Sequence, residues 1–211
     1  MHAHAQRTVL AATLLAVGAA PAHAQDSGRL TGGFAGRTQS EMLWSPPVET
    51  SLRSGFLAGA FVDVPTPVSW LRMRADGGLA QRGGFVSTDT RGNPVDGEVR
   101  GDYLSVHIEA KAGVSLGPAH VFAAAGPVID YLLRNREDPV LAQVFTEERG
   151  TVLGVAAGAG LGLRVMGAWV IEAETRWVRG LTEAYSGSGL QVRNRSREWV
   201  LRLSRMAGDS G

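Results

Sequence analysis

The clearest pattern in the sequence lies between Tyr103 and Val114, where apolar and polar residues alternate with a period of two. Successive side chains of a β-strand point to opposite faces, so this alternation predicts a strand with two chemically different faces. The apolar face holds Leu104, Val106, Ile108, Ala110, Ala112 and Val114, and the other face holds Tyr103, Ser105, His107, Glu109, Lys111 and Gly113. The alanines and valines of the apolar face suit a wall that faces lipid.

Seven further segments have the features of strands, although glycine makes the first of them weak. They are residues 28–37, 55–64, 68–86, 119–133, 151–165, 169–181 and 196–205. Short connections such as 65–67 and 115–118 alternate with long polar ones at 87–100, 134–149 and 184–195, and a polar segment at 39–54 follows the first strand. This order predicts an all-β fold, an eight-stranded antiparallel up-and-down transmembrane β-barrel. Closure would leave no unpaired sheet edge in lipid.

The N-terminal residues 1–24 have the features of a secretory signal peptide, with Arg7, an apolar run and the small-residue end Ala22-His23-Ala24. The apolar run is about half of the ~20 residues that a membrane-spanning helix needs. We therefore expect a signal peptide at 1–24, a barrel domain at 25–206 and a short C-terminal tail at 207–211. An exported barrel is expected in the outer membrane, with its long loops outside.

Charge and composition narrow the expected partners. Cleavage after residue 24 would leave 20 basic and 20 acidic residues, scattered along the chain, whereas a nucleic-acid site needs clustered basic residues. The absence of cysteine excludes disulfides and thiolate metal sites. We expect a monomer whose partners are outer-membrane lipid and the barrel-assembly machinery, with no nucleic acid and no cofactor.

Charged residues recur on the faces that should point into the barrel. The basic ones are Arg72, Arg74, Lys111, Arg164, Arg176 and Arg202, and the acidic ones are Asp63, Asp76, Glu109, Asp130, Glu172, Glu174 and Glu198. The interior of an eight-stranded barrel is only wide enough for its own side chains, so these groups are expected to pair and close the lumen. Gly154, Gly158, Gly160 and Gly162 should face the same interior and make room for larger neighbours.

Enzymatic readings rest on a few residues of the same interior. Ser105, His107 and Glu109 share one strand face and offer a nucleophile, a base and an orienting acid, but a lumen hydrogen-bond network is the simpler interpretation. A metal site from His107, His120, Glu109 and Asp130 has no diagnostic spacing, so no metal is expected. A soluble lipocalin-like barrel would invert the faces and bury more charged than large apolar side chains.

Several segments, taken in order, resemble the PorT-like outer-membrane β-barrel domains. They are GGFAGRTQS at 32–40, GLAQRGGF at 78–85, YLSVHIEAKAG at 103–113, FAAAGPVIDYLL at 122–133 and ETRWVRGL at 174–181. The pair Gly126-Pro127 is distinctive, because proline rarely occurs inside a strand. The resemblance implies the fold and the location but no catalytic residues. We therefore predict a non-enzymatic, porin-like barrel with a structural or binding role through its loops; the alternatives are a lipid-modifying or metal-dependent barrel enzyme, or a narrow pore.

Overall fold

The computed structural model describes residues 28–90, 93–138, 145, 147–165, 168–187 and 190–206, with the backbone alone at 88–90 and 93–96. The predicted signal peptide and the predicted C-terminal tail lie outside the described residues. In the part of the chain that the structure describes, no helix is long and apolar enough to cross a membrane.

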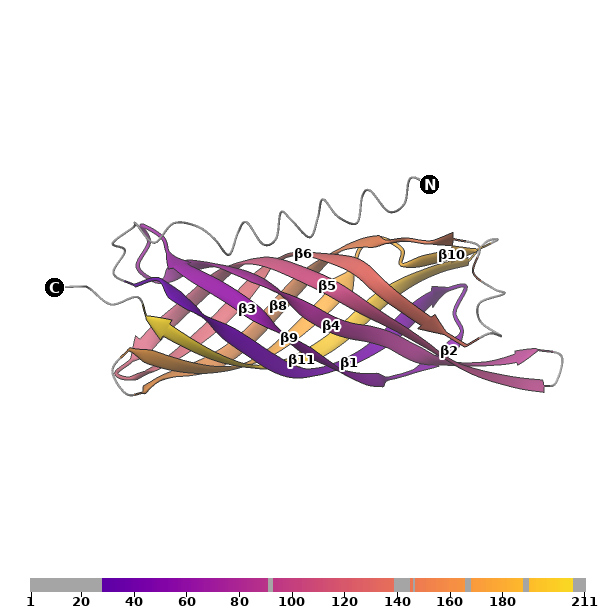
Figure 1. Ribbon diagram of the computed structural model, residues 1–211, viewed down its shortest axis with the longest axis horizontal. Helices are drawn as coiled ribbons and strands as arrows, with labels where there is room; N and C mark the ends of the chain where they lie inside the picture. The colour runs from indigo at the N-terminus through magenta and orange to yellow at the C-terminus, as the bar shows by residue number, and fades with distance from the viewer. Residues whose placement is uncertain are drawn as a thin grey trace.

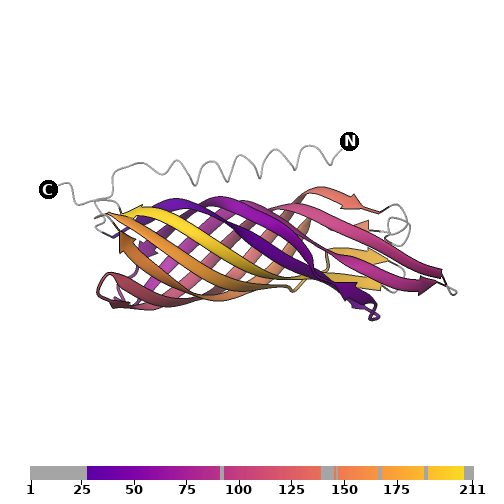
Figure 2. The same cartoon turned by 90° about the horizontal axis from the view of Figure 1, so that it is seen from below.

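Eight antiparallel strands close into a barrel, as the alternation predicts (Figures 1 and 2). In order around the wall they are β1 (Leu30–Ser45), β3 (Arg53–Pro65), β4 (Leu71–Thr90), β5 (Asn93–Leu116), β6 (Ala119–Glu137), β8 (Thr151–Val165), β9 (Trp169–Gly180) and β11 (Leu190–Met206). Pairing of β1 with β11, from Leu30 opposite Met206 to Ser45 opposite Gln191, closes the ring. Three short strands are β2 (Glu49–Ser51), which pairs with β4, β10 (Tyr185–Gly187), which pairs with β11, and β7 (Glu147–Glu148), which pairs with β10.

The strands extend further at one end of the barrel than at the other (Figure 1). At one end, which we call the turn end, short connections such as 117–118 join the strands; at the other, the hairpin end, β4 and β5 continue as a ladder to Thr90 opposite Asn93. The prediction that 87–100 is a loop was therefore wrong for most of its length, and β11 likewise begins within the predicted loop 184–195. The first strand, β1, also extends into the polar segment 39–54. Few apolar residues lie along these extensions, among them Met42, Val99 and Val192, which face the interior, so alternation alone did not reveal strands whose backbones still pair.

The two faces of the strands have the predicted orientation. On β5, Ile108 is 51% exposed on the outer wall whereas His107 is 2% exposed in the interior. Trp169 and Trp177 of β9 both lie on the outer wall. The outer wall is therefore apolar over the middle of the barrel, which is the surface that lipid requires.

The pair Gly126-Pro127 lies in β6 where the pairing with β5 is interrupted between His107 opposite Val128 and Ala110 opposite Ala125. Proline has no N–H to donate at this point. A Cβ at Gly126 would lie 1.9 Å from the carbonyl oxygen of Ile108. Glycine is therefore required here because the two backbones approach too closely for a side chain.

Candidate functional site

The interior of the barrel holds a cluster of paired charges, which we call the lumen network. Its cations are Arg72, Arg74, Arg82, Lys111, Arg176 and Arg202, and its anions are Asp63, Asp76, Glu109, Asp130, Glu172, Glu174 and Glu198. All are buried except Arg72, whose side chain is partly exposed. Because the strands alternate, every second residue of β3, β4, β5, β6, β9 and β11 contributes to one shared interior.

Arg74 lies at the centre of the half nearer the turn end. Its guanidinium donates to Glu174 and Glu172, both at 2.8 Å, across the lumen from β4 to β9. Arg202 of β11 donates to the same Glu174 carboxylate and to Asp76. The Glu174 carboxylate therefore bridges cations of β4 and β11, so the network ties opposite walls together.

Arg176 and Arg82 continue the network toward the hairpin end. Arg176 donates to Glu198 at 2.8 Å and to Asp76 at 3.0 Å, with Glu109 at 3.4 Å. Arg82 donates to the other oxygen of Glu198 at 3.0 Å and to Asp130. Ion pairs with this geometry offset the desolvation cost of burying their charges. An isolated charge in the same place would have no such compensation.

At the turn end the network reaches the mouth of the barrel, where the side chains of Arg72 and His120 are partly exposed. Lys111 donates to Asp63 at 3.0 Å and to Glu172, and His120 lies 2.9 Å from the same Glu172 carboxylate. Arg72, at the mouth of the barrel, also pairs with Asp63.

Three phenylalanine rings stack beside the cations of this half. Arg74 lies 5.2 Å from the centroid of Phe122, and Lys111 lies 4.4 Å from it. Arg202 lies 5.6 Å from the centroids of both Phe34 and Phe61. Cation–π contacts of this kind add to the ion pairs and leave less interior volume for water.

The glycines of β8 make room for these groups, as expected. A Cβ at Gly158 would lie 2.8 Å from Glu174 Oε1, and one at Gly160 would lie 2.5 Å from the Phe122 ring. A Cβ at Gly162 would lie 1.9 Å from His120 Cε1. The glycines of β8 thus leave space inside the wall, and side chains of β6 and β9 fill it.

The structure differs from the predicted set of inward charges at two positions. Arg164 is exposed at the end of β8 and has no carboxylate partner among the described residues, since a side chain at the mouth of a barrel reaches water. Arg82, which the prediction missed, is buried in the part of the network nearest the hairpin end. The signal was present, because Arg82 continues the period of two that passes through Asp76.

Ser105, His107 and Glu109 do approach one another on β5. Ser105 Oγ lies 2.9 Å from His107 Nε2, and His107 Nδ1 lies 3.8 Å from Glu109 Oε1. The cavity beside Ser105 and His107 has a volume of only about 10 Å³. A hydroxyl in such a space cannot meet an acyl substrate, so the contact fits a buried hydrogen-bond network.

The four residues of the considered metal site are not brought together. His107 lies beside Glu109, whereas His120 pairs with Glu172 and Asp130 pairs with Arg82. In the ranges that the structure covers, no three His, Asp or Glu residues gather as metal ligands.

The hairpin end is filled by an apolar cluster, which we call the cap. Its buried members are Met42, Val86, Val99, Val152, Ala184, Tyr185 and Val192, and Trp44, Val48, Phe145 and Leu190 pack against them. The Phe145 ring lies between Trp44 and Tyr185, with centroid distances of 5.5 and 4.8 Å. The Tyr185 hydroxyl donates to Asn135 at 3.0 Å, so even the polar atom of this ring has a partner.

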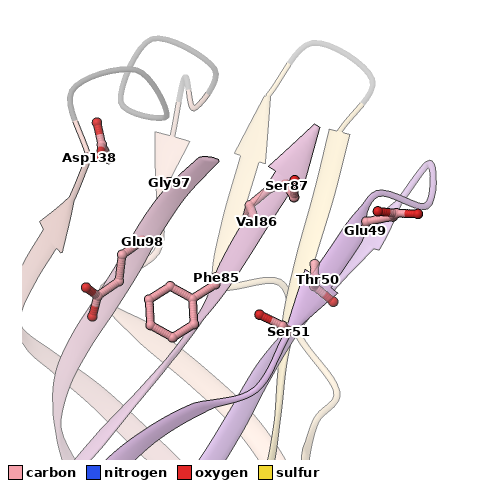
Figure 3. Close-up of a pocket in the computed structure, with 9 residues that line it drawn as sticks. All are labelled: Glu49, Thr50, Ser51, Phe85, Val86, Ser87, Gly97, Glu98 and Asp138. Carbon is pink, nitrogen blue, oxygen red and sulfur yellow. The ribbon is translucent and has the colours of Figure 1, made fainter. Parts of the chain in front are cut away.

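A surface hollow of about 520 Å³ lies on the outer wall of the hairpin end (Figure 3). It is lined by residues of β2, β4 and β5 and by Asp138, and the Phe85 ring lies between Glu98 and Ser51 in this view. Glu98 forms an ion pair with Arg53. The hollow combines an exposed aromatic ring with carboxylates.

No protein-family model matches the sequence, and a search of curated proteins finds no match. Solved structures do match. The outer membrane protein OprG from Pseudomonas aeruginosa is 11% identical with a TM-score of 0.51, over 84% of this chain and 94% of that one. Neisserial surface protein A is 12% identical with a TM-score of 0.48, over 84% and 97% of the two chains. At 11% identity the likeness to OprG concerns the fold alone, and it agrees with the small outer-membrane β-barrel described above.

Proposed function

We propose that this protein is a non-enzymatic barrel of the outer membrane with a closed lumen, and that it has a structural or binding role through the surface of its hairpin end. The barrel-assembly machinery would insert it, as a monomer, with the hairpin end outside. Membership of the PorT-like family remains a prediction, because no protein-family model matches the sequence.

The observation that carries the proposal is the filling of the interior at two levels. The lumen network crosses the barrel from wall to wall, and the apolar cap lies beyond it at the hairpin end. Ion passage would require several buried ion pairs to break and the cap to open, and each broken pair costs several kcal/mol.

Planar-bilayer recording tests the closed lumen. The purified barrel, first checked for heat-modifiable gel mobility as a sign of folding, should give no steady current at neutral pH. A double substitution in the cap, Met42→Gly with Val192→Gly, should raise the frequency of transient openings, because both side chains are fully buried there. Stable ohmic channels from the wild-type chain would replace the proposal with a narrow pore.

Location and orientation are tested by fractionation and labelling. The protein should be recovered with outer membranes, and Glu49→Cys in β2 should react with a membrane-impermeant maleimide in intact cells. Thr66→Cys, in the connection at the turn end, is the control and should react only after the membrane is opened. Recovery in the soluble periplasm would contradict the location, and the opposite labelling would reverse the orientation.

A further inference from the structure

One side of the outer wall carries a group of arginines near the hairpin end, which we call the arginine patch. Its members are Arg37 of β1, Arg179 of β9, and Arg193, Arg195 and Arg197 of β11, all exposed. On the same outward positions of these three strands, between Trp199 and the strand ends, the described residues include one carboxylate, Glu41. The patch therefore has a large excess of positive charge on an otherwise balanced chain.

The pairing of the strands brings these charges close together. Arg195 is directly opposite Arg179 on one side and Glu41 on the other. Like charges directly opposite one another destabilise an antiparallel pair. Glu41 accepts from Arg195 Nε at 2.6 Å and offsets that one charge, while Arg37, Arg179, Arg193 and Arg197 have no carboxylate partner among the described residues. The surplus calls for counter-charges from outside the chain.

The height of the patch identifies where such counter-charges lie. Arg197 is opposite Trp177, and its guanidinium lies 5.9 Å from the centroid of that ring. Exposed tryptophans of barrel walls lie at the membrane–water interface. Arg195 is two residues further along the strand, which raises it roughly 5 Å above the ring for a strand rise of ~3.4 Å and a tilt of ~40°. That is the layer of lipid headgroups.

A hollow of about 300 Å³ lies within the patch. Its lining combines Arg195, Arg197 and the Glu41 carboxylate that pairs with Arg195 with the apolar side chains of Trp177 and Leu52, which are 49% and 56% exposed. Arginine forms bidentate hydrogen bonds with phosphate, and an apolar side chain beside it suits the start of an acyl chain. The lining thus matches a molecule that has both a phosphate group and an acyl chain.

We propose that the arginine patch binds the phosphorylated headgroup of an outer-leaflet glycolipid. This inference rests on the proposed function, since it needs the hairpin end to face outward from an outer membrane. The phosphates lie against Arg179, Arg193 and Arg197, which have no carboxylate partner among the described residues, and Trp177 and Leu52 contact the apolar part of the lipid. The lipid supplies the negative charge that the strands themselves lack.

Binding of bisphosphorylated lipid A to the purified barrel in neutral detergent micelles, measured by native mass spectrometry, tests the proposal. The variant Arg193→Gln/Arg195→Gln/Arg197→Gln should lose at least tenfold in apparent affinity. The matched control, Arg134→Gln/Arg136→Gln/Arg149→Gln, removes three exposed arginines elsewhere and should bind like the wild type. Heat-modifiable mobility shows that each variant is folded.

The probe also separates the sources of phosphate. Lipid A with the same acyl chains but no phosphate should bind weakly and equally to all three proteins, and millimolar inorganic phosphate should not displace bisphosphorylated lipid A. Equal binding by the patch variant, equal binding of the dephosphorylated lipid, or complete displacement by inorganic phosphate would each overturn the inference. Such a result would leave the proposed function intact, because fractionation and conductance are measured separately.

Discussion

Removal of the Glu174 carboxylate gives the sharpest test of the lumen network. In Glu174→Ala, Arg74 and Arg202 both lose the oxygen that they share, while both remain buried. Breaking a buried pair by removing one partner typically costs about 3 to 5 kcal/mol, because a charge is left uncompensated.

Both arginines keep one other carboxylate partner, so the expected loss of unfolding free energy lies near the lower limit of this range. Arg74 keeps Glu172 at 2.8 Å, and Arg202 keeps Asp76. We therefore expect Glu174→Ala to lower the free energy of unfolding by about 3 kcal/mol. The measurement is equilibrium unfolding in urea of barrels folded into lipid vesicles, followed by tryptophan fluorescence, with the midpoint shifted at constant slope.

Two further variants isolate the charge effect. Glu183→Ala removes a carboxylate whose partner Arg149 is exposed, at 3.8 Å, and should cost less than about 1 kcal/mol. Adding Arg202→Met to Glu174→Ala should recover part of the loss, because one of the stranded cations is gone. A loss below about 1 kcal/mol in Glu174→Ala itself would mean that the lumen is hydrated and the network contributes little.

Two other predictions concern the wall. Ile108→Arg should cost about 2 to 4 kcal/mol near the membrane midplane, whereas His107→Gln, one residue away on the interior face, should cost less than half as much, and equal losses in the same urea assay would refute the orientation of β5. Gly160→Ala should lower the free energy of unfolding by about 1 to 3 kcal/mol, because its Cβ would lie 2.5 Å from the Phe122 ring. The control Gly150→Ala, where no atom lies within 4 Å of the new Cβ, should change it by less than about 0.5 kcal/mol. Similar unfolding midpoints for the two variants would show that the glycines of β8 are not needed for space.

The sequence determined the fold class and the orientation of the strands in the membrane-spanning part. A wall that separates lipid from a polar interior forces a period of two, so Ile108 and His107 are assigned to opposite faces by their neighbours alone. It did not determine where the strands end toward the hairpin end. There both faces of the β4–β5 hairpin lose the lipid constraint, and the pattern that marks a strand disappears while the backbone pairing continues.

Only the tertiary structure decided which inward charges meet. Arg74 and Glu174 are 100 residues apart, and their 2.8 Å contact depends on the circumference and stagger of the closed barrel. Arg164 shares the period of the interior residues of β8 but lies at the mouth, where water replaces an ion-pair partner. Depth along the barrel axis, which a one-dimensional pattern does not contain, separates a buried member of the network from an exposed charge.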